Sequence, residues 1–441
     1  EAPTSVTQIA SYFAVTHRDD DKVVFYDDAG YPHFSIDTGH GTQPVASVSD
    51  DSYLYVALYG SEEVVKISPS ERSILARIHV GPTPKAMALH ENRLLVTRFI
   101  SPTENGEVYD IDTNGNMALT RTIMINKVLV GDDIDHGSGV PSYLSSIVIT
   151  ADGTQAYVTA TKANTDRGTR HTNTQPLPLD DDNTVRPMMA IIDLINNQDA
   201  NTDPLTRENT IDFDNSADPS SVTFLVDPAI RVHTLQGNNI AVANNLSQNQ
   251  STQFRTDLAP QSSCATLRTL YVKNFTSRTL SAIDVAGFMH DGRLAQNVSN
   301  IATVTEEKLS PTELAGLQEF YHSDTPEMGP EGYMTCASCH FGGGHDGRVW
   351  DITNMGEGLR NTLSLNGASG TRFGLLHWSA NFDEVQDFEI QIEQLNGGEG
   401  LIPGLTFSGQ TPLELTTTGQ SDRLDALAAY VNGLGQDTVK R

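Results

Sequence analysis

The stretch YLYVALYGSEEVVKI, residues Tyr53–Ile67, consists of two short apolar runs separated by a polar turn. Apolar runs of this length, bounded by turn residues, are typical of buried β-strands. The pattern returns at Arg93–Asp110, and a spacing of about 40 residues is typical of four-stranded propeller blades. Further copies lie at Tyr12–Asp27, Gln155–Asp193 and Thr269–Asp284, with an incomplete copy at Ile240–Asn244. The repeats therefore predict a mainly β chain.

The segments between the copies also favour strands. Gly81–Leu89 and Val140–Ile149 each run from a Gly or Pro turn into an apolar strand. Together with the repeats, this pattern resembles the YVTN family of β-propellers, and the resemblance implies a propeller over residues 1–290. Six copies can be recognised. We expect seven blades, and the longer gap between residues 160 and 238 leaves the count open.

The second feature is Cys336-Ala337-Ser338-Cys339-His340, which occurs once in the chain. Two thiols at this spacing can bond to both vinyl groups of a haem while the adjacent His ligates the iron, so the motif predicts one covalent haem c. A redox dithiol or half of a zinc site would use the same two cysteines. A redox dithiol usually belongs to a βαβ unit, and a zinc site needs a second Cys/His pair. Cys264, the remaining cysteine, is far away in the sequence.

Residues 291–441 show helical signals instead of strand repeats. Ser310-Pro311-Thr312-Glu313 has the form of a capping box with Pro at the first helical position, and apolar residues follow at helical spacing as far as Phe320. A second amphipathic pattern, from Ser421 to Leu434, predicts a closing helix. Terminal helices that pack over a haem are what a small cytochrome c fold needs. We therefore expect a small α-helical cytochrome c domain at residues 291–441.

This region resembles the haem domains of bacterial di-haem cytochrome c peroxidases and MauG-like proteins. The resemblance is carried by the haem motif and the helix before it, by Arg360-Asn361-Thr362 and by the segment around Trp378. The family carries two haems, whereas this chain has one attachment motif. The intramolecular relay that such peroxidases use is therefore absent, unless a partner supplies the second haem.

The sixth ligand of the iron decides the chemistry. A thioether opposite His raises the reduction potential and closes the iron to substrate, a second His lowers the potential, and a vacant position permits peroxide or oxygen chemistry. Met355 is the first candidate, because related domains carry a distal ligand just before the Gly-x-Arg-Asn element. His345 and His377 are alternatives, and core packing would also explain a Met at this position.

Two further side chains are candidates for contact with a haem. Arg360 has a planar guanidinium that can pair with a haem propionate, although a surface salt bridge would also account for it. Trp378 can stack near the haem edge, and core packing is the alternative.

Composition restricts the partners and the compartment. Lys and Arg number 28 against 56 Asp and Glu, which gives a formal net charge of −28. A nucleic-acid partner is therefore not expected, and no apolar run approaches the roughly 20 residues that span a bilayer. Covalent haem attachment in bacteria takes place outside the cytoplasmic membrane. Because the sequence begins at Glu1 without Met or an apolar leader, we expect a periplasmic or extracellular protein whose signal peptide has been removed.

These inferences combine into one prediction: a seven-bladed β-propeller followed by a small α-helical cytochrome c domain with a single haem. The function expected is electron transfer to or from a redox partner protein, with the propeller as docking or structural platform. The alternative is a haem-dependent oxidoreductase, resembling the peroxidases, that acts on peroxide or a small molecule. The propeller offers no base, nucleophile or cofactor motif that would favour catalysis.

Overall fold

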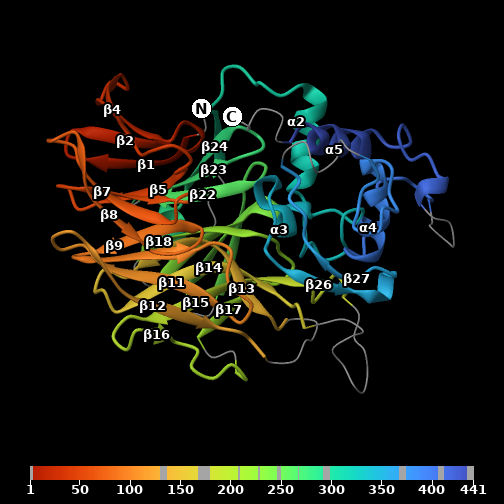
Figure 1. Ribbon diagram of the computed structural model, residues 1–441, viewed down its shortest axis with the longest axis horizontal. Coiled ribbons are helices and arrows are strands. Elements are labelled where there is room, and N and C mark those ends of the chain that lie inside the picture. The colour runs from red at the N-terminus through yellow and green to blue at the C-terminus, as the bar shows by residue number, and fades with distance from the viewer. Residues whose placement is uncertain are drawn as a thin grey trace. The chain divides into compact units, whose positions relative to one another are not determined.

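In the computed structural model, the described residues of the 441-residue chain are 3–129, 137–166, 179–206, 209–226, 229–245, 250–266, 268–291, 298–366, 374–405 and 412–434. Strands dominate them and form successive sheets whose neighbouring strands follow one another along the chain (Figure 1). The chain divides into two compact units. The first unit comprises residues 1–127, 141–160 and 189–210, and the second comprises residues 128–140, 161–188 and 211–441.

Six sheets of the described residues form the blades of a β-propeller. The first three contain β1 (Pro3–Ile9), β2 (Tyr12–His17), β3 (Lys22–Tyr26) and β4 (Pro32–Asp37); β5 (Pro44–Ser49), β6 (Leu54–Leu58), β7 (Glu63–Ser68) and β8 (Ser73–His79); and β9 (Pro84–His90), β10 (Arg93–Arg98), β11 (Asn105–Asp112) and β12 (Ala118–Asn126). The fourth contains β13 (Val140–Ile149), β14 (Gln155–Ala163), β15 (Val185–Asp193), β16 (Gln198–Asp199) and β17 (Thr210–Asp212). The last two contain β18 (Pro219–Val226), β19 (Ile230–Leu235), β20 (Ile240–Asn245) and β21 (Gln250–Arg255); and β22 (Pro260–Ala265), β23 (Thr269–Asn274), β24 (Thr279–Asp284) and β25 (Val298–Ala302).

The predicted strand pairs are confirmed as neighbouring strands of a blade. In β6 and β7, Leu54 pairs with Ile67 and Val56 pairs with Val65 in antiparallel register. Successive side chains of a strand point to opposite faces, so one strand contributes to two cores. Leu54 and Val56 pack with the apolar residues of the first blade, whereas Tyr55 packs with those of the third. This double burial explains why the strands read as nearly continuous apolar runs.

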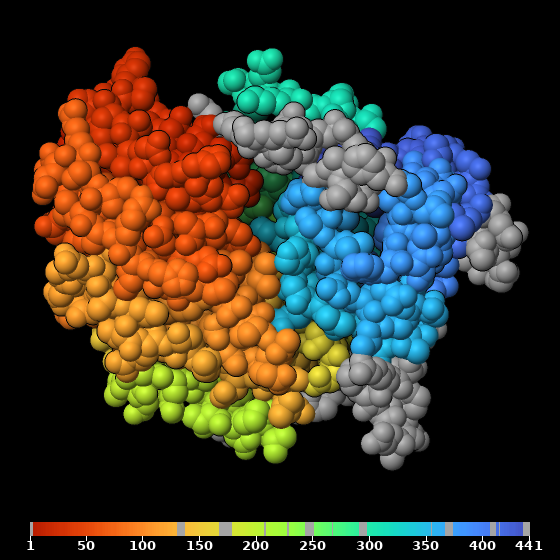
Figure 2. All heavy atoms as spheres, viewed as in Figure 1, coloured from red at the N-terminus to blue at the C-terminus, as the bar shows by residue number. Residues whose placement is uncertain are grey.

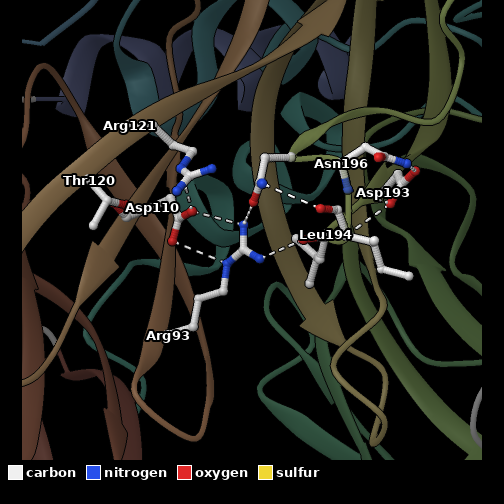
Figure 3. Close-up of polar contacts among 9 residues, drawn as sticks. Arg93, Asp110, Thr120, Arg121, Asp193, Leu194 and Asn196 are labelled. Atoms are coloured by element: carbon white, nitrogen blue, oxygen red, sulfur yellow. Dashed lines mark hydrogen bonds and ion pairs between the residues drawn. The ribbon is translucent and has the colours of Figure 1, made fainter.

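A buried ion pair joins strands of the first unit. The guanidinium of Arg93 in β10 donates to both carboxylate oxygens of Asp110 in β11, over 3.2 and 2.8 Å (Figure 3). The same side chain donates to the carbonyl oxygen of Leu194 and to the side chain of Asn197, which follow β15. Arg93 therefore links the third blade to the end of a strand in the fourth. Figure 2 shows residues of β1 to β12, from red to orange, as one continuous packed surface.

The second unit contains the last two blades and the segment that follows them. Its helices and hairpin are α1 (Ala286–Asp291), α2 (Pro311–Phe320), α3 (Cys336–His340), β26 (Val349–Ile352), β27 (Gly358–Asn361), α4 (Glu389–Gln394) and α5 (Asp422–Gly433). The two predicted helices are confirmed as α2 and α5, including the capping box of Ser310 and Glu313. They lie side by side (Figure 1) and share an apolar core around Leu317, Phe320 and Leu424.

The predicted fold class is wrong in two respects. The described residues contain six blades and not seven, because the interval between residues 160 and 238 holds the long connection from β14 to β15, the short strands β16 and β17, and the start of the fifth blade. The segment after β25 is not a separate helical cytochrome c domain either. Its helices are short and belong to one compact unit with the last two blades.

The apolar contacts of α2 explain the second correction. Tyr321, directly after α2, packs edge-on against Phe275 of the sixth blade, with ring centroids 5.5 Å apart. Ala259, between the fifth and sixth blades, is buried in the same cluster as Leu317 and Phe320. The helices therefore use the propeller as part of their core. None of the helices in the described ranges is long and apolar enough to cross a membrane.

Candidate functional site

The Cys-x-x-Cys-His motif forms a short helix, α3, whose first turn is stabilised by a capping box between Thr335 and Ser338. Thr335 is the N-cap, and its hydroxyl accepts a hydrogen bond from the backbone N–H of Ser338 over 3.2 Å. In return, the hydroxyl of Ser338 accepts from the backbone N–H of Thr335 over 3.0 Å. The N–H of Thr335 thereby gains an acceptor, and the N–H of Ser338, which also lies 3.1 Å from the carbonyl oxygen of Thr335, gains a second one.

A propeller residue completes this cap. The carboxylate of Asp218, directly before β18, accepts from the hydroxyl of Thr335 over 2.5 Å and from that of Ser338 over 2.7 Å. All three side chains are buried. Burial raises the pKa of Asp218 to about 6, and the two hydroxyl donors oppose that shift. The motif is thus tied to the fifth blade within the second unit.

Cys336 and Cys339 are not joined in a disulfide, and both side chains are partly buried. Burial raises the pKa of Cys336 to about 12 and raises that of Cys339 well above its usual range. Reactive redox dithiols have depressed pKa values in electropositive surroundings, so these thiols do not match that alternative. Cys336 packs on the core that contains α2 and α5, and Cys339 packs on a second apolar cluster. We call the second group the Cys339 cluster. It consists of Cys339 with Ala163, Leu179, Val185, Met334, Trp350, Ile352, Met355 and Leu395.

His340 ends α3, and its ring is hydrogen-bonded to backbone groups of Gly344 and Leu363. Its Nδ1 lies 3.2 Å from the carbonyl oxygen of Gly344. Burial lowers the pKa of His340, with opposing contributions from carbonyl groups of the loop and from Asp346. A metal-binding His commonly donates its second N–H to a carbonyl, which fixes the ring and leaves Nε2 for the metal.

Met355 lies in the turn between β26 and β27, and the structure brings it into the Cys339 cluster. Its side chain is partly buried. The cluster also includes Trp350 and Ile352 of β26, so the thioether lies in apolar surroundings together with one of the motif thiols.

The two alternative ligands lie in different settings. His345 is exposed, and its Nδ1 accepts from the backbone N–H of Gly347. His377 stacks on Phe382 at 4.7 Å, and its Nδ1 lies 3.0 Å from Asn381 Oδ1 and 3.5 Å from Glu357 Oε1. His345 is thus engaged by its own loop, and His377 by its own segment and by Glu357 of the hairpin.

Arg360 lies in β27 and Trp378 in the segment after residue 374, which contacts β27, and neither belongs to the Cys339 cluster. The Nε of Arg360 lies 3.3 Å from Glu357 Oε2, and its NH2 group donates to the hydroxyl of Ser379 over 3.0 Å. Trp378 is half exposed and donates from Nε1 to the carbonyl oxygen of Asn361 over 2.8 Å. The salt bridge that was the alternative for Arg360 is therefore observed, whereas Trp378 is too exposed for core packing, which was its alternative.

Sequence reasoning missed three carboxylates that organise this region. Besides Asp218, these are Asp346, which accepts from Trp350 Nε1 over 2.9 Å, and Glu357, which joins the hairpin to the segment after residue 374. Asp346 and Trp350 are four residues apart in a Gly-rich loop, which is a weak signal. No spacing connects Asp218 with a motif more than 100 residues later.

The residues of the motif fit a covalent haem. Two thiols and an imidazole follow one another on a capped helix, the imidazole has its Nδ1 held by a carbonyl, and one thiol lies among apolar side chains. A zinc site would need more ligands. Among the described residues, no three His, Cys, Asp or Glu side chains are grouped to hold a metal ion.

No family model and no curated protein matches the chain. Among solved structures, one similar chain is from hydrazine synthase of Kuenenia stuttgartiensis, with 15% sequence identity, a TM-score of 0.50, and coverage of 69% of this chain and 84% of that chain. A streptogramin B lyase (9% identity, TM-score 0.42, 69% and 84% covered) and a chain of the mitotic checkpoint complex (10%, 0.46, 69% and 80%) are also similar. At such low identity, the likeness to hydrazine synthase shows the fold alone. The chain is a β-propeller protein.

Proposed function

We propose that this protein is an exported mono-haem c-type cytochrome that transfers electrons. One haem c is bound covalently by Cys336 and Cys339, and His340 is its axial ligand. The observation that carries the proposal is the geometry of α3, in which the capped helix ends at an imidazole whose Nδ1 is held by the carbonyl of Gly344. Bound haem supplies one-electron redox chemistry.

Met355 is the proposed second axial ligand. Its membership of the Cys339 cluster supports this role, because the apolar side chains of Trp350 and Ile352 exclude water and favour a neutral thioether there. A thioether ligand would close the iron to substrates and favours an electron carrier over an oxidoreductase. His345 is exposed, and His377 is held by Asn381 and Glu357, so both are weaker candidates.

The proposed partner is a redox protein with a basic docking surface, and the propeller is its docking or structural platform. The net charge of −28 supports this choice, because complementary charge speeds the encounter of two proteins. Export follows from the proposed haem chemistry, since covalent attachment in bacteria occurs outside the cytoplasmic membrane.

A visible absorption spectrum tests this function. The full-length protein is expressed with the machinery for haem c attachment, and ferric and ferrous spectra are recorded with and without cyanide and peroxide. An electron carrier with Met ligation gives a weak far-red thioether band, sharp ferrous peaks and no response to either ligand. A high-spin ferric spectrum that changes at once with peroxide would contradict the carrier and support the peroxidase-like oxidoreductase.

A further inference from the structure

We infer that Asp218 is a positioning residue for haem attachment: from the fifth blade, it presets the helix that carries Cys336, Cys339 and His340. The inference rests on the proposed function and deepens it, because it assigns the propeller a direct part in the haem site. Asp218 belongs to the strand repeats and the motif to the segment after them, so nothing in the motif identifies it.

The hydrogen bonds of the cap require a carboxylate. Each hydroxyl of the cap already accepts a backbone N–H, from Ser338 to Thr335 and from Thr335 to Ser338. The hydroxyl protons therefore need acceptors elsewhere, and they find one on each oxygen of Asp218. Asn at this position would offer one oxygen acceptor and an NH2 donor. A buried hydroxyl would then lose its acceptor or give up its contact to the helix.

Besides this cap, the helix is held by apolar packing of Cys336 and Ala337 on the core of α2 and α5 and of Cys339 on the Cys339 cluster. It is five residues long, and a helix of that length is unstable in isolation, because nucleation is unfavourable. Thr335 directly precedes the motif and Ser338 lies within it. The position of these two capping residues therefore sets the direction in which Cys336 and His340 project. Attachment adds each thiol S–H across a vinyl C=C bond: sulfur bonds to one carbon, hydrogen goes to the other, and no oxidant is consumed. Addition at both groups requires both sulfurs to be placed in advance.

The backbone around Asp218 is shaped for this close approach. A Cβ at Gly237 would lie 2.8 Å from Thr335 Cγ2 and 2.7 Å from Ala217 Cβ, so only glycine leaves room for the cap. Asn238 accepts from the backbone N–H of Ala217 over 2.5 Å and donates to the carbonyl of Gly332 over 3.4 Å. The loop after β19 thus contacts both Ala217, which directly precedes Asp218, and Gly332, which lies in the segment leading into α3.

The test compares Asp218→Asn with a matched control, Asp199→Asn. Burial raises the pKa of Asp199 to about 6 as well, but its carboxylate accepts only from the backbone N–H groups of Asn126 and Asn201 in the first unit. Full-length proteins are made with the haem c machinery. Covalent haem per chain is measured by pyridine haemochrome and intact mass, and the reduction potential of the loaded fraction is measured by titration. Ser338→Ala, which keeps Asp218 and the thiols, is a second variant in case Asp218→Asn does not fold.

Asp218→Asn is expected to lower covalent haem per chain about tenfold and to shift the reduction potential of what remains, because supporting residues around metal ligands have effects of this size. Ser338→Ala is expected to change both readouts in the same direction by less. Asp199→Asn is expected to match the wild type in both, even where its melting temperature falls. Equal haem content and potential in Asp218→Asn, Ser338→Ala and Asp199→Asn would overturn the inference while leaving the proposed function intact. A wild-type chain without covalent haem would overturn both.

Discussion

The Nδ1 atom of His340 lies 3.2 Å from the carbonyl oxygen of Gly344, four residues further along the chain. This contact orients the ring with Nε2 free of that carbonyl, as an axial ligand requires. It distinguishes His340 from His345, whose exposed ring accepts a hydrogen bond from Gly347.

His340→Ala is expected to retain covalent haem, because both thiols remain, but to lose the low-spin ferric spectrum. Added imidazole should restore that spectrum by occupying the emptied axial position. His345→Ala is the matched control and should resemble the wild type. A wild-type spectrum in His340→Ala would remove His340 from the site.

Met355→Ala is expected to lower the reduction potential or to let cyanide bind, because a thioether opposite His raises the potential and blocks the iron. The control is Met289→Ala, a Met that packs on the core of the last two blades. Potentiometry and cyanide titration give the answer. If the two variants have the same reduction potential and the same response to cyanide, Met355 is a packing residue and not a ligand of the iron.

Asp110→Ala is expected to reduce the free energy of unfolding by about 2 kcal/mol, because it leaves Arg93 without its two-point carboxylate partner. Arg121 contacts the same carboxylate at 3.3 Å but is about half exposed, so Arg121→Ala should cost less than about 1 kcal/mol. Urea unfolding measures both. Equal losses of unfolding free energy in the two variants would show that the ion pair of Arg93 and Asp110 contributes no more than the exposed contact of Arg121.

Asp199→Asn is expected to change how stability depends on pH. Burial raises the folded-state pKa of Asp199 from 3.8 to about 6, so between these values the folded chain holds a proton that the unfolded chain has released. Stability from this group is complete below pH 3.8 and is lost as pH rises through about 6, a loss of roughly 3 kcal/mol for a shift of this size. Relative to Asp199→Asn, the wild type should therefore lose stability between pH 4 and pH 6.5. Parallel stability curves for the two proteins would refute the assignment.

Gly316→Ala should destabilise the second unit strongly. A Cβ at Gly316 in α2 would lie 1.8 Å from the carbonyl oxygen of Ala426 in α5, and backbone cannot move aside cheaply. The expected loss is about 3 kcal/mol, the upper part of the range for overpacking. At Gly433, where a Cβ would meet nothing closer than 3.4 Å, Ala should be tolerated, and thermal unfolding compares the two.

The blades were largely predictable, because their signal is local. In Tyr53–Ile67, each strand is apolar on both faces, since Leu54 and Tyr55 enter different cores. The number of blades was not predictable from length. The interval between residues 160 and 238 looked long enough for a seventh blade, yet its described strands complete the fourth sheet and begin the fifth.

The candidate site was predictable only in part. The capping box of Ser310 and the motif at Cys336 are short patterns with a physical meaning; the first begins the expected helix, and the second forms α3, for which no helix was predicted. The attachment of those helices to the propeller was not predictable, because it depends on single contacts such as Asp218 with Ser338 and Phe275 with Tyr321, which join distant segments. The predicted contacts of Arg360 and Trp378 with a haem remain predictions.

The most direct test of covalent haem binding by α3 is the mass of the intact, denatured protein, expressed in full length with the haem c machinery. The wild-type polypeptide is expected to carry the added mass of one haem, and the double variant Cys336→Ala/Cys339→Ala is expected to carry none while keeping its β-sheet circular dichroism. A wild-type mass equal to that of the polypeptide alone would show that α3 does not bind haem covalently.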